Sequence, residues 1–123
     1  ILTNAKENEP EDVIDRAYDF VTDWIAANRK RFANDAVPCL GKIEAGKVLV
    51  IATELRRALE DNGFSYTKCR KGFRDRGYVD TFDDSQGKKR SQYLRKIQGV
   101  SVRVFCFPIQ VEGMYPPEDD FLS

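Results

Sequence analysis

Lysine and arginine side chains are concentrated in the second half of the chain, first within residues 65–77. A helical period of about 100° per residue places Tyr66, Cys69 and Phe73 on one side of a helix and basic residues on the other. The basic side carries Lys68, Lys71 and Arg74, with Thr67 beside them and Arg70 at the margin. Because one side can pack while the other contacts phosphates, this stretch predicts a helix that binds a polyanion.

A second basic cluster follows within a predicted β-hairpin. Strands are expected at residues 78–82 and 91–98, and the turn-rich segment Asp83–Gly87 is expected to form the tip between them. The basic residues of this hairpin are Lys88, Lys89 and Arg90, with Arg95 and Lys96 behind them. A basic helix that runs into a hairpin is typical of a winged helix, whose two parts would contact one DNA duplex together.

Both clusters also have an ordinary explanation. Lysine and arginine are the usual residues of an exposed helix face, and charges on a hairpin protect its edges from aggregation. Ser65, Tyr66 and Thr67 near the helix start could touch base edges, but the same residue types serve as caps and packing residues. Contacts to the DNA backbone are therefore better supported than the reading of bases.

A helix-turn-helix unit is predicted to carry the basic helix. Thr53 is expected to cap a short preceding helix with an apolar side, and Asn62-Gly63 is expected to end it. Ser65 then caps the basic helix, and Gly77 suits the left-handed residue that ends it. This order of helix, tight turn and helix allows the second helix to enter a groove of DNA.

The remaining elements surround this unit. Apolar residues at helical spacing predict a long amphipathic helix that starts near Pro10 and reaches Phe32, with Tyr18 and Trp24 in the core. The cations of residues 28–31 at its end complement the helix dipole or serve as an auxiliary phosphate contact. Further strands are expected at residues 40–44, 47–52 and 100–107.

These elements predict an α+β fold, a winged helix with a long N-terminal helix and an extra β-hairpin. The single domain is expected over residues 10–107, between a flexible lead-in at 1–9 and an irregular acidic tail at 108–123. The 123-residue chain has a formal net charge of 0, but residues 64–107 carry eleven Lys or Arg against four Asp or Glu. Such segregation of charge indicates a polyanionic partner.

The composition of the chain also indicates the cellular compartment in which the protein is expected. No apolar run approaches the roughly 20 residues of a membrane helix. Cys39, Cys69 and Cys106 lie in apolar surroundings without the spacing of metal ligands, and we expect them to be buried. Without a signal peptide, these features favour a soluble protein in a reducing, cytoplasmic compartment. Because the chain begins at Ile1, we expect a fragment of a longer protein.

The residues argue against most enzyme classes. The chain contains no histidine, the commonest general base and metal ligand, and its eight glycines do not form a phosphate-binding loop. We therefore expect no cofactor, no small-molecule substrate and no catalysis. One enzymatic alternative is a metal nuclease built on Glu44, Asp80 and Asp83 with Lys47, although such acids usually solvate turns and strand edges.

Four short motifs carry a resemblance to a known family. They are Asp23-Trp24-Ile25-Ala26-Ala27-Asn28 with Phe32, Gly41-Lys42-Ile43, Arg74-Asp75-Arg76-Gly77-Tyr78, and Arg95-Lys96-Ile97-Gln98-Gly99 with Val102-Arg103-Val104-Phe105. Through them, most of residues 13–107 resembles the C-terminal region of large ATPase/helicase proteins carried by phages, integrated elements and staphylococcal-type cassettes. The resemblance implies an ATP-driven motor domain upstream and makes this piece its appended winged helix, with no catalytic residues to carry over.

Residues and resemblance together predict a non-catalytic DNA-binding accessory domain of a mobile-element or phage replicative helicase. Its basic helix and wing would hold the phosphate backbone of duplex or forked DNA without sequence preference. Its expected partners are DNA and the upstream ATPase domain of the same chain. The alternative function is protein interaction, in which the winged helix docks on motor subunits or a replication partner and the charges only solvate the surface.

Overall fold

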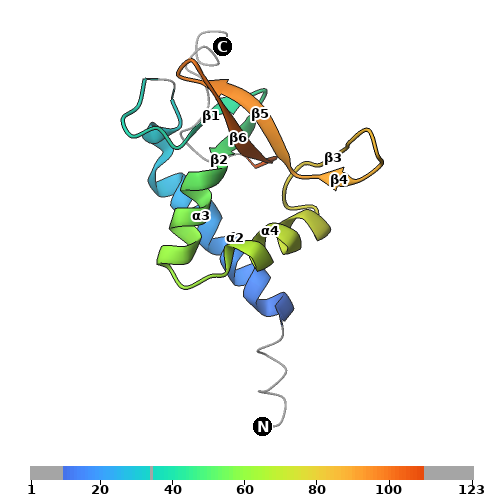
Figure 1. Cartoon of the computed structure of the whole chain (residues 1–123). Coiled ribbons are helices and arrows are strands. Elements are labelled where there is room, and N and C mark those ends of the chain that lie inside the picture. Colours follow the sequence, from blue (N-terminus) through green and yellow to red (C-terminus); the bar gives the residue numbers. More distant parts are fainter. Residues whose placement is uncertain (1–9, 34, 110–123) are drawn as a thin grey trace, which may run out of the picture.

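The computed structural model describes residues 10–33 and 35–109; the predicted lead-in at 1–9 and residues 110–123 of the tail predicted at 108–123 lie outside them. The helical elements are α2 (Pro10–Ala27), the short 3-10 helix η1 (Arg29–Arg31), α3 (Ala52–Asp61) and α4 (Tyr66–Asp75). A four-stranded antiparallel sheet has the order β1 (Gly41–Glu44), β2 (Lys47–Ile51), β6 (Val100–Phe107) and β5 (Gln92–Ile97). The α-helices lie on one side of this sheet (Figure 1). The predicted α+β winged-helix class is thereby confirmed.

The main core lies between the helices and one face of the sheet. Phe73 of α4 is fully buried, and its ring contacts Phe107 edge-on at 6.1 Å between centroids. Tyr18 and Trp24 of α2 pack against this core, as their helical spacing predicts. A smaller cluster of Leu49, Ile97, Val104 and Cys106 covers the other face of the sheet. Cys69 and Cys106 are buried and Cys39 is partly buried, so the expectation for the cysteines holds best for the first two.

Two helix boundaries differ from the prediction. α2 ends at Ala27 rather than near Phe32, because the side-chain amide of Asn28 donates to the carbonyl of Trp24 at 2.9 Å and closes the last turn. α3 begins at Ala52, so the prediction of Thr53 as its cap is wrong. Ile51 occupies that position with no side-chain hydrogen bond, since β2 leads directly into the helix.

The helix-turn-helix unit forms as predicted. Gly63 adopts a positive φ of 84° in the turn after α3, and Phe64 packs there against Phe20 at 5.7 Å between ring centroids. The hydroxyl of Ser65 accepts a hydrogen bond from the N–H of Lys68 at 3.3 Å and so caps α4. Gly77 takes the left-handed conformation just after α4, with φ of 75°.

The predicted strand at 78–82 is wrong in most of its length. Residues 78–81 form no strand, because Tyr78 stacks on Tyr18 at 4.1 Å and Val79 is buried against the helices. A backbone hydrogen bond, from the N–H of Asp80 to the carbonyl of Cys106 at 2.8 Å, attaches this segment to β6.

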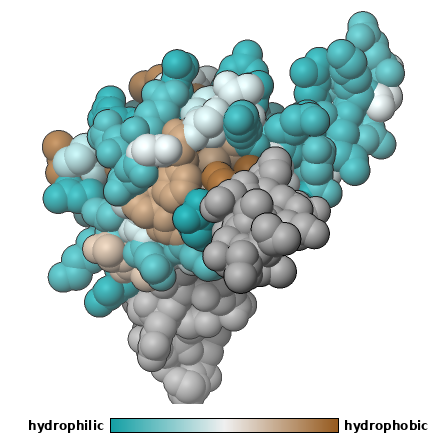
Figure 2. Space-filling model, turned by 90° about the horizontal axis from the view of Figure 1, so that it is seen from below, coloured by the Kyte–Doolittle hydropathy of each residue, from teal (hydrophilic) through white to brown (hydrophobic). Residues whose placement is uncertain are grey.

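The hairpin with the basic residues is a separate two-stranded ribbon. It consists of β3 (Phe82–Asp83) and β4 (Lys89–Arg90), and we call residues 82–90 the wing. The wing projects sideways from the body (Figure 1), and the face of it that Figure 2 shows is mostly hydrophilic, although Phe82 is an exposed apolar residue of the wing. The returning strand then continues as β5, which turns into β6 through Gln98 and Gly99 with φ of 55° and 80°. Within the described residues, no helix is long and apolar enough to cross a membrane.

Candidate nucleic-acid interface

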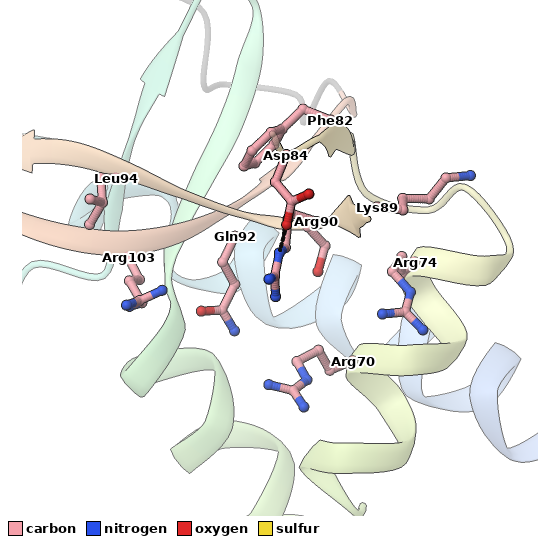
Figure 3. A pocket seen from close by; sticks show the side chains of 10 residues that line it. Arg70, Arg74, Phe82, Asp84, Lys89, Arg90, Gln92, Leu94 and Arg103 are labelled. Carbon is pink, nitrogen blue, oxygen red and sulfur yellow. Dashed lines mark hydrogen bonds and ion pairs between the residues drawn. The ribbon is translucent and has the colours of Figure 1, made fainter. Parts of the chain in front are cut away.

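A groove of about 690 Å³ lies between α4, the wing and the outer half of the β5–β6 hairpin. The side chains that line it are Arg70, Arg74, Phe82, Asp84, Lys89, Arg90, Ser91, Gln92, Leu94 and Arg103. Five of these residues are cationic and one is acidic. Figure 3 shows arginines from α4, from the wing and from β6 arranged around one space, with Lys89 extending away from it. The fold thus brings together positive charge from three separate segments.

The ring of Tyr66 lies close to two arginines, Arg70 in this groove and Arg56 outside it. The guanidinium of Arg70 lies 5.7 Å from the centroid of the Tyr66 ring, and that of Arg56 from α3 lies 5.6 Å from the same ring. The Tyr66 hydroxyl accepts a hydrogen bond from the side chain of Gln92 at 3.2 Å. Burial raises the pKa of Tyr66, so the ring stays neutral beside both cations at physiological pH.

Asp84 organises the wing. One oxygen of its carboxylate accepts the N–H groups of Gln86 at 2.9 Å and Lys88 at 2.8 Å, which closes the tip. The other oxygen lies 2.8 Å from Nε of Arg90. The hydrogen bond from the Lys88 N–H, followed by the contact with Arg90, lowers the pKa of Asp84 below its usual value. The carboxylate is therefore ionised at neutral pH and holds the tip in one shape.

α4 presents two basic surfaces rather than one. Arg70 and Arg74 face the groove, whereas Lys68, Lys71 and Thr67 are exposed and do not line it. Arg74 also forms an ion pair with Asp75 at 3.3 Å. Arg70, which the helical period places at the margin, thus joins Arg74 on the groove side of the helix.

The basic residues of the predicted hairpin are divided by the structure. Lys89 and Arg90 line the groove, and Lys88 is exposed at the tip of the wing. Arg95 does not lie behind them. It belongs to the opposite face of the sheet, where its guanidinium lies 3.6 Å from Glu44 and 5.3 Å from the centroid of the Tyr93 ring. The strand alternation of β5 places Arg95 there.

Lys96 lies on the same face of β5 as Leu94 but two residues farther along, and it does not line the groove. Within the four-stranded sheet its cross-strand partner is Ser101. The structure therefore separates Arg95 and Lys96 from the surface formed by α4 and the wing.

Two arginines of this surface were not among the residues that the sequence indicated. Arg103 stands opposite Leu94 in the register of β5 and β6, and Arg56 reaches the Tyr66 ring from α3. Alternation along β6 places Arg103 on the same face as Phe105, but only the register of the sheet brings it beside α4 and the wing.

Two acids of the nuclease alternative, Glu44 and Asp80, form local ion pairs. Asp80 forms an ion pair with Lys47 at 2.6 Å and lies 3.4 Å from the sulfur of Cys106. Glu44 contacts Lys42 at 3.7 Å and Arg95 at 3.6 Å. In residues 10–33 and 35–109, no group of three or more Cys, Asp or Glu side chains is placed to hold a metal ion. Burial raises the pKa of Cys106 to about 11, so its thiol is protonated at neutral pH.

The comparisons with known proteins agree with this architecture. The family model of the Cch helix turn helix domain matches residues 12–112, which include every helix and strand of the described residues except the first two residues of α2. Comparison with curated proteins and with solved structures gives no match. Helix-turn-helix domains are generally non-catalytic and bind DNA through their second helix. Since the match spans most of the chain, the chain belongs to the Cch helix-turn-helix domain family, and this membership indicates DNA binding.

Proposed function

We propose that this chain is the DNA-binding accessory domain of a mobile-element or phage replicative helicase and that it holds the phosphate backbone of duplex or forked DNA. The observation that carries the proposal is the convergence of cations from α4 and from the wing around one groove. Two basic elements on one side of a domain can contact a single duplex at the same time.

The duplex contacts belong to α4, on its exposed side and at the edge of the groove, and to the wing. The residues proposed for them are Lys68, Lys71, Arg74, Lys88, Lys89 and Arg90. Each phosphate that such a residue neutralises releases counterions, so the affinity should fall steeply with salt, with a slope of about 0.9 per contact. The preformed wing supports this role, because hydrogen bonds already order its tip and binding therefore costs little conformational entropy there.

Contacts to the backbone explain the site better than the reading of bases. Ser65 is engaged as the cap of α4, and the Tyr66 hydroxyl accepts from Gln92. Thr67 is exposed at the start of α4 and is the candidate left for touching a base edge. The domain should therefore bind DNA with little sequence preference.

The parent protein follows from the family resemblance. The four motifs of residues 13–107 support an ATPase motor domain upstream in the same chain, for which this domain would supply an additional grip on DNA. Winged helices also dock on proteins, so the motor itself is a possible partner of the same fold.

Charge reversal tests the proposal. Changing Lys68, Lys71 and Arg74 together to Glu should abolish binding to a labelled duplex or fork, measured by fluorescence anisotropy at low salt. A matched control changes Arg29, Lys30 and Arg31 to Glu, since these exposed cations lie far from the wing (Figure 1). The control carries the same change in net charge and should weaken binding far less. Unchanged binding by the α4 variant would exclude the proposed interface.

The alternative, docking on a protein, is supported by two exposed apolar side chains. Val37 and Val100 are 85% and 59% exposed, and the hydrogen bond from Gln98 to the carbonyl of Ala36 at 2.8 Å brings their two segments together. A salt titration separates the two functions. Failure to bind any DNA at low salt would favour docking on a protein over DNA binding.

A further inference from the structure

Two grooves of the surface meet at Gln92 and Arg103. The first is the groove between α4 and the wing, and the second, of about 390 Å³, lies between the start of α3 and β6. Gln92 and Arg103 line both of them, and Tyr66 with Arg56 lines the second. A concave path therefore runs from the wing, past α4, to the first turn of α3. We call its inner part, lined by Arg56, Arg70, Gln92, Leu94 and Arg103, the inner groove.

The cations of the inner groove differ in type from those on the exposed side of α4. The inner groove carries the guanidinium groups of Arg56, Arg70 and Arg103, whereas the exposed side of α4 carries the ammonium groups of Lys68 and Lys71. A guanidinium donates two parallel hydrogen bonds to a phosphate and also stacks on the flat face of a base, while an ammonium acts mainly as a point charge. The inner groove thus offers groups that can contact both parts of a nucleotide.

An exposed apolar side chain completes this chemistry. Leu94 is 63% exposed although it points into a groove surrounded by charge. The side-chain amide of Gln92 lies beside it on the same face of β5 and can donate to or accept from a base edge. An apolar surface flanked by arginines and an amide suits an unpaired base better than a paired one, because a paired base is stacked and shielded within its duplex.

The shape of the inner groove also selects one strand over two. Proteins contact a duplex by inserting convex elements such as a helix into its grooves, with phosphates along both rims. Concave sites of about 300 to 1,000 Å³ enclose small ligands. Grooves of about 690 and 390 Å³ are in this range and can admit a few nucleotides of one strand. The convex side of α4, with Lys68 and Lys71, remains available to duplex DNA.

We propose that the inner groove binds single-stranded DNA while the exposed side of α4 contacts the adjoining duplex, so that the domain recognises a junction between single and double strands. This inference rests on the proposed DNA-binding function and specifies its substrate. Backbone phosphates contact Arg56, Arg70 and Arg103, and an unpaired base lies against Leu94. The wing closes the outer end of the same path and separates the strand from solvent on that side.

Binding to three labelled DNAs tests the inference, using the full chain and fluorescence anisotropy. The DNAs are a blunt duplex, a short single strand, and the same duplex with a single-stranded tail. Leu94→Ser and Arg103→Gln should each weaken binding to the single strand and to the tailed duplex by about three- to tenfold. Both should leave binding to the blunt duplex within about twofold of the unmodified chain. Both residues are exposed, and circular dichroism confirms that each variant is folded.

A variant of the exposed side of α4 should show the opposite preference among the DNAs. Lys68→Gln with Lys71→Gln should weaken binding to the blunt duplex by more than its binding to the single strand. Equal losses on all three DNAs for Leu94→Ser would overturn the inference, as would single-strand binding that neither groove variant alters. Binding to the blunt duplex distinguishes failure of the inner-groove assignment from failure of the proposed function. If the unmodified chain binds it but not the single strand, only the inner-groove assignment fails; if it binds no DNA, the proposed function fails as well.

Discussion

Nε of Arg90 lies 2.8 Å from a carboxylate oxygen of Asp84, so the single acid of the groove is paired with one of its cations. The other oxygen of Asp84 accepts two N–H groups of the wing tip. Asp84 therefore preforms the wing and, at the same time, offsets one positive charge that could otherwise contact a phosphate. The effect of Asp84 on the shape of the wing should therefore favour DNA binding, whereas its negative charge should weaken it.

Replacing Asp84 by Asn separates the two effects. The amide oxygen still accepts the N–H groups of the tip, but the negative charge beside Arg90 is removed. We expect the affinity for duplex DNA to rise several-fold, with a slope against log salt that is steeper by about 0.9. Fluorescence anisotropy across a salt series measures both quantities.

The control for this change is Asp83→Asn, which alters the net charge equally at an exposed position of β3. An equal rise for both variants would show that net charge alone acts. A fall for Asp84→Asn would show that the order of the wing tip matters more than the freed cation.

The cap of α4 gives a prediction about stability. Ser65→Ala removes the hydroxyl that accepts the Lys68 N–H, and loss of such a cap costs about 1 kcal/mol in the free energy of unfolding. Ser65→Thr keeps the acceptor and should stay within a few tenths of a kcal/mol of the unmodified chain. Urea unfolding followed by circular dichroism measures the difference. A Ser65→Ala variant as stable as the parent would mean that solvent satisfies this N–H equally well.

Local patterns predicted the parts of the fold that depend on local spacing. The two sides of α4, its cap at Ser65 and its left-handed end at Gly77 all follow from the helical period and from residue type. Cys69 and Phe73 are buried and Lys68 is exposed, as the predicted apolar and basic sides of this helix require.

Contacts between distant segments were the part that the sequence did not reveal. Tyr78 was expected in a strand, but its ring stacks on Tyr18 of α2, which lies far away in the chain. Arg103 joins the groove only through the register of β5 and β6, and Arg95 leaves it through the same alternation. Spacing along one strand indicates which residues share a face of the sheet. It does not indicate which helix, strand or loop packs against that face.

Close packing between α2 and α4 depends on one glycine. A Cβ at Gly72 would lie 2.7 Å from Cδ1 and 2.8 Å from two further atoms of Ile14, a residue only 7% exposed. Gly72→Ala gains about 1 kcal/mol of helix propensity, while the overlap costs about 1 to 3 kcal/mol. We expect a net destabilisation of about 1 kcal/mol in urea unfolding.

A double-mutant cycle tests the cause. In an Ile14→Ala background the overlap disappears, so Gly72→Ala should stabilise the domain by about 1 kcal/mol relative to Ile14→Ala alone. Simple additivity of the two substitutions would show that the contact with Ile14 does not determine the effect of Gly72→Ala.

Asp15 makes the stability of the domain depend on pH. One oxygen of its carboxylate accepts from the hydroxyl of Tyr78 at 2.7 Å and from Nη1 of Arg76 at 2.6 Å, which fastens the end of α4 to α2. The hydrogen bond from Tyr78, with the nearby charge of Arg76, lowers the pKa of Asp15 below its ordinary value of 3.8. Because the folded state favours the ionised form, this contribution is fully present above that value and is lost as the pH falls through the lowered pKa.

Asp15→Asn should therefore lower the melting temperature at neutral pH, and its difference from the unmodified chain should shrink as the pH falls below the ordinary value of 3.8. Thermal unfolding followed by circular dichroism over this range measures the difference. Asp23→Asn, at an exposed position of α2 outside the cluster, gives the effect of charge alone. A difference for Asp15→Asn that persists unchanged into strong acid would mean that the cluster stabilises the fold by geometry rather than by ionisation, because protonation of Asp15 would then leave its contacts with Arg76 and Tyr78 intact.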